Sequence, residues 1–374
     1  MSPAHVVGWG KYVPEQVLTN DDLSRIVDTS DGWIRTRTGI AERRIAEDGE
    51  TTSTMATKAA WQALEAAGLK PAEVDLIIVA TATPDRAFPA TACLVQDALG
   101  ATNAAAFDLS AGCTGFVYAL AVATDILAAH DGSGDIATAL VIGSETLSRI
   151  TDWGDRTTCV LFGDGAGAVV LRADDSPGGV LSTFLGADGS GADLLYLPAG
   201  GSEEPASHRT VSEGHHYLRM RGREVFRFAV RAMPDAAQRV LEAAGLTPAD
   251  VDLLVPHQAN QRILEAAGRA LDLAAERMYS NLERYGNTSA ASIPIALCEA
   301  VEEGRIQRDD LVVCVGFGAG LTWGATALRW SVPLPTAPPT PWGKARYRVL
   351  RAYASFHSLI RRLVRWLLSR GVKE

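Results

Sequence analysis

Cysteine chemistry is the first activity that this sequence suggests. Cys113 lies in FDLSAGCTGFVYAL, where a strand-like run meets small residues and then a long apolar stretch of helical character. The thiol is therefore expected at a tight strand-to-helix turn, facing the start of a helix. Free N–H groups and the helix dipole stabilise a thiolate there, and the flanking Gly112 and Gly115 let a substrate approach the backbone. Cys113 is predicted to be a nucleophile.

The other four cysteines are predicted to be buried structural residues. They lie in apolar runs without such a turn, at Cys93, Cys159, Cys298 and Cys314. An odd total of five, with no CxxC spacing, argues against a disulfide framework and against a zinc site. We expect no metal and no cofactor.

Two polar residues in the second part of the chain could act with this cysteine. His257 directly follows a buried-strand pattern in VDLLVPHQAN, and Asn287 lies in RYGNTSAASIPIAL, a Gly-flanked turn that opens an Ala-rich helix. Each also has an ordinary structural interpretation, as a histidine after a strand or as a helix N-cap. Their places relative to an internal repeat make catalysis the stronger interpretation.

This repeat relates the two parts of the chain. Residues 59–81 return 177 positions later, at 236–258, with about two-thirds of the first 18 positions identical. Each copy reads as a helix, a terminating glycine, a turn with proline and a short buried strand. Asn287 follows Cys113 by 174 positions, so the two occupy matching places. We expect two helix N-termini to face each other across a pseudo-twofold axis, with His257 between them.

Strand-like runs alternate with Ala-rich helical stretches in both parts. Beyond the repeat they lie at 137–144, 167–173, 310–317 and 324–330. This alternation predicts α/β layers with mostly covered sheets. The expected domains are an N-terminal half at 1–175, which carries the nucleophile, and a C-terminal half at 176–332, which carries His257 and Asn287.

Composition indicates a folded protein with a large buried core. The chain has 374 residues, 47% hydrophobic and 21% charged, with a net charge of −9; these values exclude a disordered or fibrous protein. The N-terminus lacks the pattern of a signal peptide, and no stretch reaches the ~18 apolar residues of a membrane span. A cytoplasmic location and no nucleic-acid partner are expected.

Seven motifs make the chain resemble a known family, the thiolase-like condensing enzymes, and among them ketoacyl-acyl carrier protein synthase III. The resemblance runs from about residue 4 to 332 through TSDGWIRTRTGIAERR, AFPATAC, AGCTGF, FGDGAGAVVL, PHQANQRI, YGNTSAASIP and GFGAGLTWGATAL. It implies a five-layered α-β-α-β-α thiolase-like fold of two duplicated halves, and a homodimer. The combination of Cys, His and Asn is typical of this branch.

The resemblance also implies roles in a decarboxylating Claisen condensation. Cys113 would attack an acyl-CoA thioester, and the backbone N–H groups of Cys113 and Ala319 would hold the oxyanion. His257 and Asn287 would stabilise the enolate formed when a malonyl thioester loses CO2. The family usually has Gly where this chain has Ala319, which would be strained only at positive φ. Phe317 is either a gating aromatic beside the cysteine or plain core.

CoA-binding residues follow from the same resemblance. Trp33 and Arg37 would hold the adenine and phosphate groups of CoA, and Arg156 would form the other face of the adenine clamp. Thr157 stands where Gly is common.

Three arginines, Arg262, Arg223 and Arg269, would offer positive charge to an acidic carrier protein, or else are solvated surface residues. Arg223 stands where Asn is usual in the family. Phe88 matches the aromatic that closes the acyl pocket across the dimer interface, and a bulky residue there favours a short primer such as acetyl.

Two glycine-rich segments resemble nucleotide-binding loops, at 163–168 and 316–320. Both run into apolar strands and do not open a helix, so the structural context of such a loop is absent. We interpret them as tight turns beside the active site.

The C-terminus lies beyond the resemblance. A Pro-rich linker at 333–343 precedes a basic amphipathic helix at 344–374, which holds nine Lys or Arg residues and one Glu. This helix could lie on an anionic membrane surface, pack on its own chain or dock an acidic partner.

The predicted reaction is acyl-CoA, most simply acetyl-CoA, plus malonyl-acyl carrier protein giving 3-oxoacyl carrier protein, CoA and CO2, which initiates fatty acid synthesis. An alternative is an acyltransferase or ketide synthase of secondary metabolism that passes the acyl group from Cys113 to a non-malonyl acceptor. A catalytically silent scaffolding subunit is a third interpretation. The enolate donor Asn287 argues against simple transfer, and the intact Cys113, His257 and Asn287 argue against a silent subunit.

Overall fold

Each copy of the repeat folds as a helix, a turn and a buried strand. In a computed structural model that describes residues 3–129, 136–332 and 341–371, α3 (Thr52–Ala67) leads into β4 (Leu76–Ala80), and α7 (Gly222–Ala243) leads into β11 (Leu253–Pro256). A glycine with positive φ follows each helix, and a proline begins a single 3-10 turn before each strand. The expected order of elements is confirmed.

The first sheet contains five strands in the order β1-β7-β6-β4-β5. β4 runs parallel to β5 and β6, whereas β7 runs antiparallel to β6 and to β1. The strands other than β4 are β1 (Ala4–Tyr12), β5 (Ala105–Leu109), β6 (Thr138–Glu145) and β7 (Gly165–Ala173).

The second sheet contains four strands in the order β11-β12-β13-β8. β11 and β12 are parallel, and the other two pairs are antiparallel. The strands other than β11 are β8 (Gly179–Ala187), β12 (Leu311–Gly318) and β13 (Thr322–Arg329). All strands of the first sheet lie within 1–175 and all strands of the second within 176–332; that these halves are separate domains stays a prediction.

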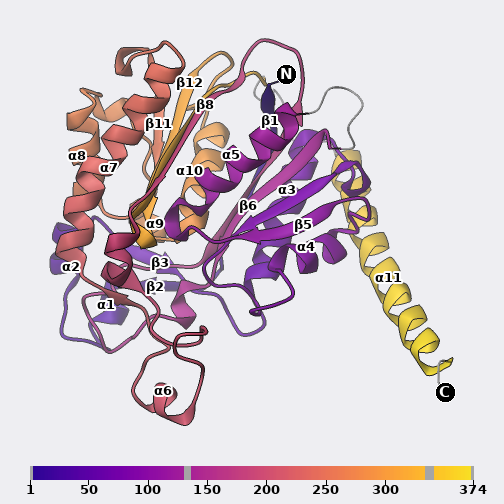
Figure 1. Cartoon of the computed structure of the whole chain (residues 1–374), viewed down its shortest axis with the longest axis horizontal. Coiled ribbons are helices and arrows are strands. Elements are labelled where there is room, and N and C mark those ends of the chain that lie inside the picture. Colours follow the sequence, from indigo (N-terminus) through magenta and orange to yellow (C-terminus); the bar gives the residue numbers. More distant parts are fainter. Residues whose placement is uncertain (1–2, 130–135, 333–340, 372–374) are drawn as a thin grey trace.

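Helices form three layers around these sheets (Figure 1). α5 (Gly115–Ala128) and α10 (Ser292–Glu302) lie between the sheets, where one hydrophobic cluster joins side chains of both. A second cluster joins α3 and α4 (Thr91–Leu99) to the outer face of the first sheet, and a third joins α7 and α8 (Gln261–Ala270) to the outer face of the second. The predicted five-layered α-β-α-β-α fold is confirmed.

Short elements gather at one end of the layers (Figure 1). They are β2 (Val17–Thr19), β3 (Glu42–Arg44), α1 (Asn20–Leu23), α2 (Asp31–Thr38), α6 (His208–Ser212), α9 (Leu282–Tyr285), β9 (Leu195–Tyr196) and β10 (Arg219–Met220). Several of their residues border the cavity described below.

The glycine-rich segments lie as the sequence predicts. The first runs into β7, and the second closes β12 and continues into β13. The prediction for Cys93 is wrong, because this residue is exposed on α4, which buries only one face. Cys159, Cys298 and Cys314 are buried, as expected.

The C-terminal helix α11 (Pro341–Gly371) starts inside the segment predicted as linker 333–343, whose residues 333–340 lie outside the described residues. Its first part packs on α4, and its end extends away from the body (Figure 1). Of the three targets open for this helix, the structure therefore confirms contact with its own chain, made by one face only.

Candidate active site

A cavity of about 440 Å³ brings together the three residues predicted to be catalytic. Cys113, His257 and Asn287 all line it, together with Phe317. The cysteine comes from the first half of the chain and the other three from the second. The cavity therefore lies where the two halves meet.

Cys113 lies in a single 3-10 turn, Gly112–Thr114, between β5 and α5. Gly112 has a φ of 53°, and a Cβ on it would lie 2.9 Å from the Ala319 nitrogen. A Cβ on Gly318 would lie 2.6 Å from the Cys113 nitrogen. The end of β12 thus approaches the nucleophile turn so closely that only glycine fits on either side.

Burial raises the pKa of the Cys113 thiol to about 12, with the nearby Glu145 acting in the same direction. The expectation that the helix start stabilises a thiolate is therefore wrong, because desolvation outweighs the hydrogen bonds from Ser289 and the Cys113 backbone that lower the thiol pKa. The Ser289 hydroxyl contacts the thiol and donates to the Glu145 carboxylate at 3.0 Å. The thiol must lose its proton as it attacks.

The imidazole of His257 is held from one side. Its Nδ1 lies 2.6 Å from Ser292 Oγ on α10, whereas its Nε2 is buried without a partner among the described residues. Burial lowers the pKa of His257 to about 3, so the ring is neutral at neutral pH. When the Ser292 hydroxyl donates to Nδ1, the proton is on Nε2, which is then available as a donor.

The Asn287 amide is oriented by the residue two positions later. The Ser289 N–H donates to Asn287 Oδ1 at 2.8 Å, which leaves the Nδ2 group as the donor. Ser289 has a φ of 49°, a conformation that costs energy for a side chain larger than glycine. Strained backbone at Ser289 thus orients the Asn287 amide and places the Ser289 hydroxyl beside Cys113.

The departure at Ala319 carries no backbone strain. Ala319 lies outside the positive-φ region, and the neighbours Gly320 and Leu321 adopt positive φ instead. Its nitrogen lies next to the Cys113 turn, since a Cβ added to Gly112 would be 2.9 Å from it. The alanine is therefore compatible with a backbone donor at this position.

Phe317 borders His257 directly. The two ring centroids lie 5.3 Å apart with planes at 66°, and Phe317 is almost fully buried. Phe317 also lines the cavity. It is therefore both a core residue and a neighbour of the site, the two alternatives that the sequence left open.

Two arginines flank one tryptophan at the cavity mouth. The guanidinium carbon of Arg37 lies 5.6 Å from the Trp33 ring centroid, and that of Arg156 lies 5.3 Å from it. Trp33, Arg37 and Thr157 line the cavity; Arg156 does not, and donates to the Asp28 carbonyl at 2.7 Å. The arrangement offers a flat, positively charged surface.

Two of the three other predicted arginines also line the cavity. Arg223 is at the start of α7, and Arg262, at the start of α8, lies 5.3 Å from the Phe226 ring centroid. Arg269 is at the far end of α8, exposed, and 3.9 Å from Glu265. Of these three arginines, Arg223 and Arg262 therefore add to the positive charge at the mouth.

Phe88 does not line this cavity, and 84% of its surface is exposed. An exposed phenylalanine is available to a second subunit, but a single chain does not test that role. Closure of the acyl pocket by Phe88 stays a prediction.

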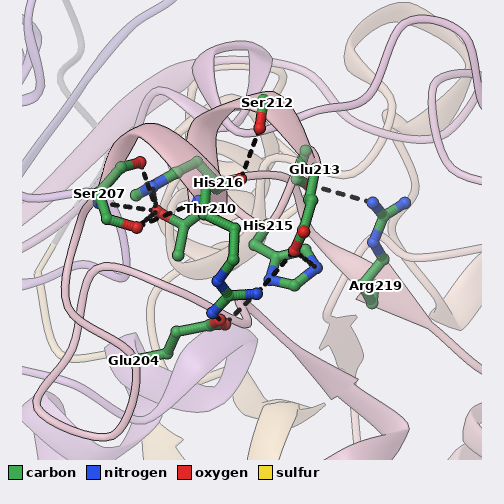
Figure 2. A network of polar contacts seen from close by, with 10 residues as sticks. Glu204, Ser207, Thr210, Ser212, Glu213, His215, His216 and Arg219 are labelled. Atoms are coloured by element: carbon green, nitrogen blue, oxygen red, sulfur yellow. Dashed lines mark hydrogen bonds and ion pairs between the residues drawn. The ribbon is translucent and has the colours of Figure 1, made fainter.

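A polar network braces the segment between β9 and β10, whose Leu195 and Met220 line the cavity. Figure 2 shows the Glu204 and Glu213 carboxylates close to the His215 imidazole, whose Nδ1 lies 3.0 Å from Glu204. Arg209, on α6, pairs with both of these glutamates. The network therefore links residues along the segment that connects these two strands.

Ser292, Ser289 and Glu145 were not predicted as site residues. Ser292 and Ser289 lie in the NTSAAS segment, so their closeness to Asn287 in the sequence could have identified them as site residues. Glu145 ends β6 and accepts hydrogen bonds from Thr81, Thr83, Ser289 and the Ala82 N–H. No sequence pattern indicates that this buried carboxylate faces Cys113.

Comparisons with known proteins agree with this geometry. A family profile described as 3-oxoacyl-[acyl-carrier-protein (ACP)] synthase III matches residues 107–189, and the profile of the C-terminal part of these enzymes matches 241–330. The beta-ketoacyl-[acyl-carrier-protein] synthase III of Caldanaerobacter subterraneus subsp. tengcongensis is 56% identical over 328 residues, 88% of this chain and 98% of that protein.

Solved structures agree as well. The 3-oxoacyl-[acyl-carrier-protein] synthase III of Aquifex aeolicus has a TM-score of 0.79 at 51% identity, covering 87% of this chain and 99% of that one. The priming beta-ketosynthase of the R1128 polyketide biosynthetic pathway has a TM-score of 0.81 at 37% identity, covering 89% and 98%. Identity of this extent reaches well beyond a shared fold, and the chain belongs to the beta-ketoacyl-[acyl-carrier-protein] synthase III family.

Proposed function

We propose that the protein catalyses the decarboxylating Claisen condensation of an acyl-CoA with malonyl-acyl carrier protein, giving 3-oxoacyl-acyl carrier protein, CoA and CO2. The observation that carries this proposal is the meeting of Cys113, a neutral His257 and Asn287 on one cavity. The names of the relatives support the same reaction. Acetyl-CoA is the proposed primer, and initiation of fatty acid synthesis is the proposed place of the reaction.

In the first half-reaction, the Cys113 sulfur attacks the thioester carbonyl, and CoA leaves as its thiol. Because the thiol pKa is raised by burial, the proton leaves as the C–S bond forms and ends on the departing CoA sulfur. The backbone N–H groups of Cys113 and Ala319 stabilise the tetrahedral oxyanion. Removal of one such donor typically costs ~100- to 1000-fold in rate.

In the second half-reaction, the malonyl thioester loses CO2 and leaves an enolate. His257 Nε2–H and the Asn287 Nδ2 group donate to its oxygen, and a neutral imidazole can do so because its other nitrogen faces Ser292. The enolate carbon then attacks the acyl carbonyl on Cys113. The C–S bond breaks, the product stays on the carrier, and Cys113 regains a proton.

Substrate binding uses the mouth of the cavity. The Trp33 ring, with Arg37 and Arg156 beside it, suits an adenine and the phosphates of CoA. Arg223 and Arg262 lie where the acidic carrier protein would dock, and Arg269 is a more distant contact. A homodimer, in which Phe88 of each chain limits the partner's acyl pocket, is part of the proposal, as is action in the cytoplasm.

Likeness to a priming ketosynthase of a polyketide pathway favours one second candidate, the same condensation serving secondary metabolism. The higher identity to the relative from Caldanaerobacter favours fatty acid synthesis. Both candidates share the chemistry at Cys113.

A stepwise labelling experiment tests the reaction. Enzyme mixed with labelled acetyl-CoA is expected to carry the label on the peptide that contains Cys113, and added malonyl-acyl carrier protein should move it into a 3-oxobutyryl carrier product. A label that stays on Cys113 until a hydroxyl or amine acceptor is supplied would reject condensation in favour of simple acyl transfer.

A further inference from the structure

The C-terminal helix α11 is fixed to the body along one face. The Tyr347 hydroxyl donates to two backbone carbonyls at the end of α3, Leu64 at 3.0 Å and Leu69 at 2.9 Å. Further along, Ser358 donates to the Asp97 carboxylate at 2.6 Å, and Arg361 and Arg362 each pair with Asp97 at 2.9 Å. After Arg362, every side chain whose exposure the structure describes is exposed.

Large apolar side chains cover the free part of this helix. Half of the exposed large hydrophobic residues in the described chain lie between 349 and 368, a small fraction of its length. Seven of them, 38–66% exposed, lie in the last ten of these positions: Leu359, Ile360, Leu363, Val364, Trp366, Leu367 and Leu368. Such a concentration at one place marks an interaction surface.

These seven side chains form a wide arc. At 3.6 residues per turn they cover roughly 200° of the helix circumference. Arg362 and Arg365 lie in the remaining arc, with Arg361 at its border. A coiled-coil seam is narrower than this, whereas an apolar arc of this width with arginines opposite is typical of a helix lying in a membrane interface.

Charge distinguishes the possible occupants. Residues 344–374 hold nine Lys or Arg and one Glu, whereas the rest of the chain carries −17. A second copy of the helix would bring like charges together and offer no acidic side chains for pairing. An acidic protein would match the arginines but leave much of the apolar arc in water. A bilayer with anionic headgroups satisfies both, since headgroups pair with Arg365 and the other basic residues that Asp97 does not hold, while Trp366 and the leucines enter the acyl boundary.

We propose that α11 anchors the enzyme to the surface of an anionic membrane. The part from Tyr347 to Ser358 stays docked on α3 and α4, and the arc from Leu359 to Leu368 enters the interface. The matched family profile ends at residue 330, so this anchor lies beyond it. Among the described helices none has the length and apolar character needed to cross a bilayer.

Vesicle flotation of the full chain tests this anchor. The protein is expected to float with vesicles of equal parts phosphatidylcholine and phosphatidylglycerol, but not with phosphatidylcholine alone. Salt at about 0.5 M should weaken binding because it screens the arginines. The double variant Leu363→Ser/Leu367→Ser should bind about 100-fold more weakly, roughly tenfold for each leucine removed from the interface.

A control is Val211→Ser, which removes an apolar side chain on α6 that is 67% exposed, more than Leu363 at 55% and Leu367 at 54%. It should float like the native protein. All variants should be acylated at Cys113 at the native rate, because neither leucine nor Val211 lines the cavity.

Failure of the native chain to float with the anionic vesicles would overturn the proposal. So would equal flotation of the double variant. If the native chain failed to float and the leucine substitutions instead reduced an oligomer seen by light scattering, the occupant would be a second copy of the chain. If the native chain failed to float and the leucine substitutions weakened its binding to acyl carrier protein, the occupant would be an acidic protein.

Discussion

Substitution of Gly318 by alanine should disable the proposed oxyanion hole without changing the side chains of Cys113, His257 or Asn287. Gly318 ends β12 directly against the Cys113 turn, and its φ of −164° is extended, so an alanine there costs no backbone strain. The added Cβ is the whole perturbation. It would lie 2.6 Å from the Cys113 nitrogen and 3.0 Å from the Thr114 nitrogen.

The size of the effect follows from these separations. Ordinary contact begins at 3.4 Å, so the Cys113 nitrogen must retreat by up to 0.8 Å. This nitrogen is the proposed oxyanion donor, and a misplacement of about 1 Å costs on the order of 100-fold in rate. We therefore expect Gly318→Ala to acylate Cys113 about 100-fold more slowly than the native protein.

Gly316→Ala is the matched control, two residues earlier on the same strand. Its added Cβ would meet the tip of the Ile293 side chain at 3.3 Å, and that tip can move. Acylation by labelled acetyl-CoA, followed by rapid quenching and normalised to the folded fraction from circular dichroism, should fall less than about threefold for this control.

Two results would refute this reasoning. Acylation of Gly318→Ala at a rate within threefold of the native protein would mean that the turn accommodates the Cβ or that the Cys113 N–H is not a donor. Alternatively, equal losses in the two folded variants would show that strand packing, and not the oxyanion hole, sets the rate.

Three further substitutions address other parts of the account. Ser292→Ala removes the hydrogen-bond partner of His257 Nδ1. Loss of this hydrogen bond, about 1–1.5 kcal/mol, should slow CO2 release about tenfold, whereas the rate of Cys113 acylation should not change. Equal slowing of both steps in quenched-flow assays would contradict the orienting role of Ser292. Trp33→Ala should raise the KM for acyl-CoA about tenfold with little change in kcat, because it removes binding surface far from the reacting bond; steady-state kinetics with an unchanged KM would remove this residue from the CoA site. Glu299→Gln should destabilise the fold at pH 7 by about 3 kcal/mol, because it removes the buried charge that pairs with Lys11 and Arg284 and leaves Lys11 only the exposed Glu302. Burial acts to raise the pKa of Glu299, but hydrogen bonds from Lys11 and its other partners outweigh it and lower the pKa below 4.5, so the native protein itself loses this stability as pH falls from 4.5 through the lower folded-state value. Urea unfolding should therefore show a difference between the two proteins that is large at pH 7 and shrinks below pH 4.5; a constant difference would show that the charge of Glu299 is not its cause.

Much of the fold was predictable from the sequence because the same pattern of local signals occurs in two segments of the chain. The helix, glycine, turn and strand at 59–81 and 236–258 carry the same local signals, and both copies fold as those signals predict. The placement of Cys113 and Asn287 at matching turns followed from the repeat offset. Both residues precede a central helix, α5 or α10, and line one cavity.

What the sequence could not supply depends on contacts between distant segments. Glu145 and Cys113 are separated by a helix and a strand in the sequence, and only the fold brings Ser289 between them. The raised pKa of Cys113 is a property of burial in the closed site, which residue types and a helix start do not reveal. The positive φ of Ser289 is likewise invisible in a residue that is not glycine.

The C-terminal helix marks another limit. Its amphipathic pattern was clear in the sequence, but its start and its docked face were not. Tyr347 and Ala354 are buried against the body, whereas the apolar residues after Arg362 remain exposed. The periodicity of the sequence distinguished the faces of this helix, but only its tertiary contacts show which face the body covers.

The most direct test of the central claim is CO2 release from malonyl-acyl carrier protein by enzyme already acetylated at Cys113, compared with Asn287→Ala. We predict release that requires the acyl group and falls ~100- to 1000-fold in the variant, because the Asn287 amide is one of the two proposed enolate donors. A stable acyl-enzyme that releases no CO2, or equal release by both proteins, would contradict the account.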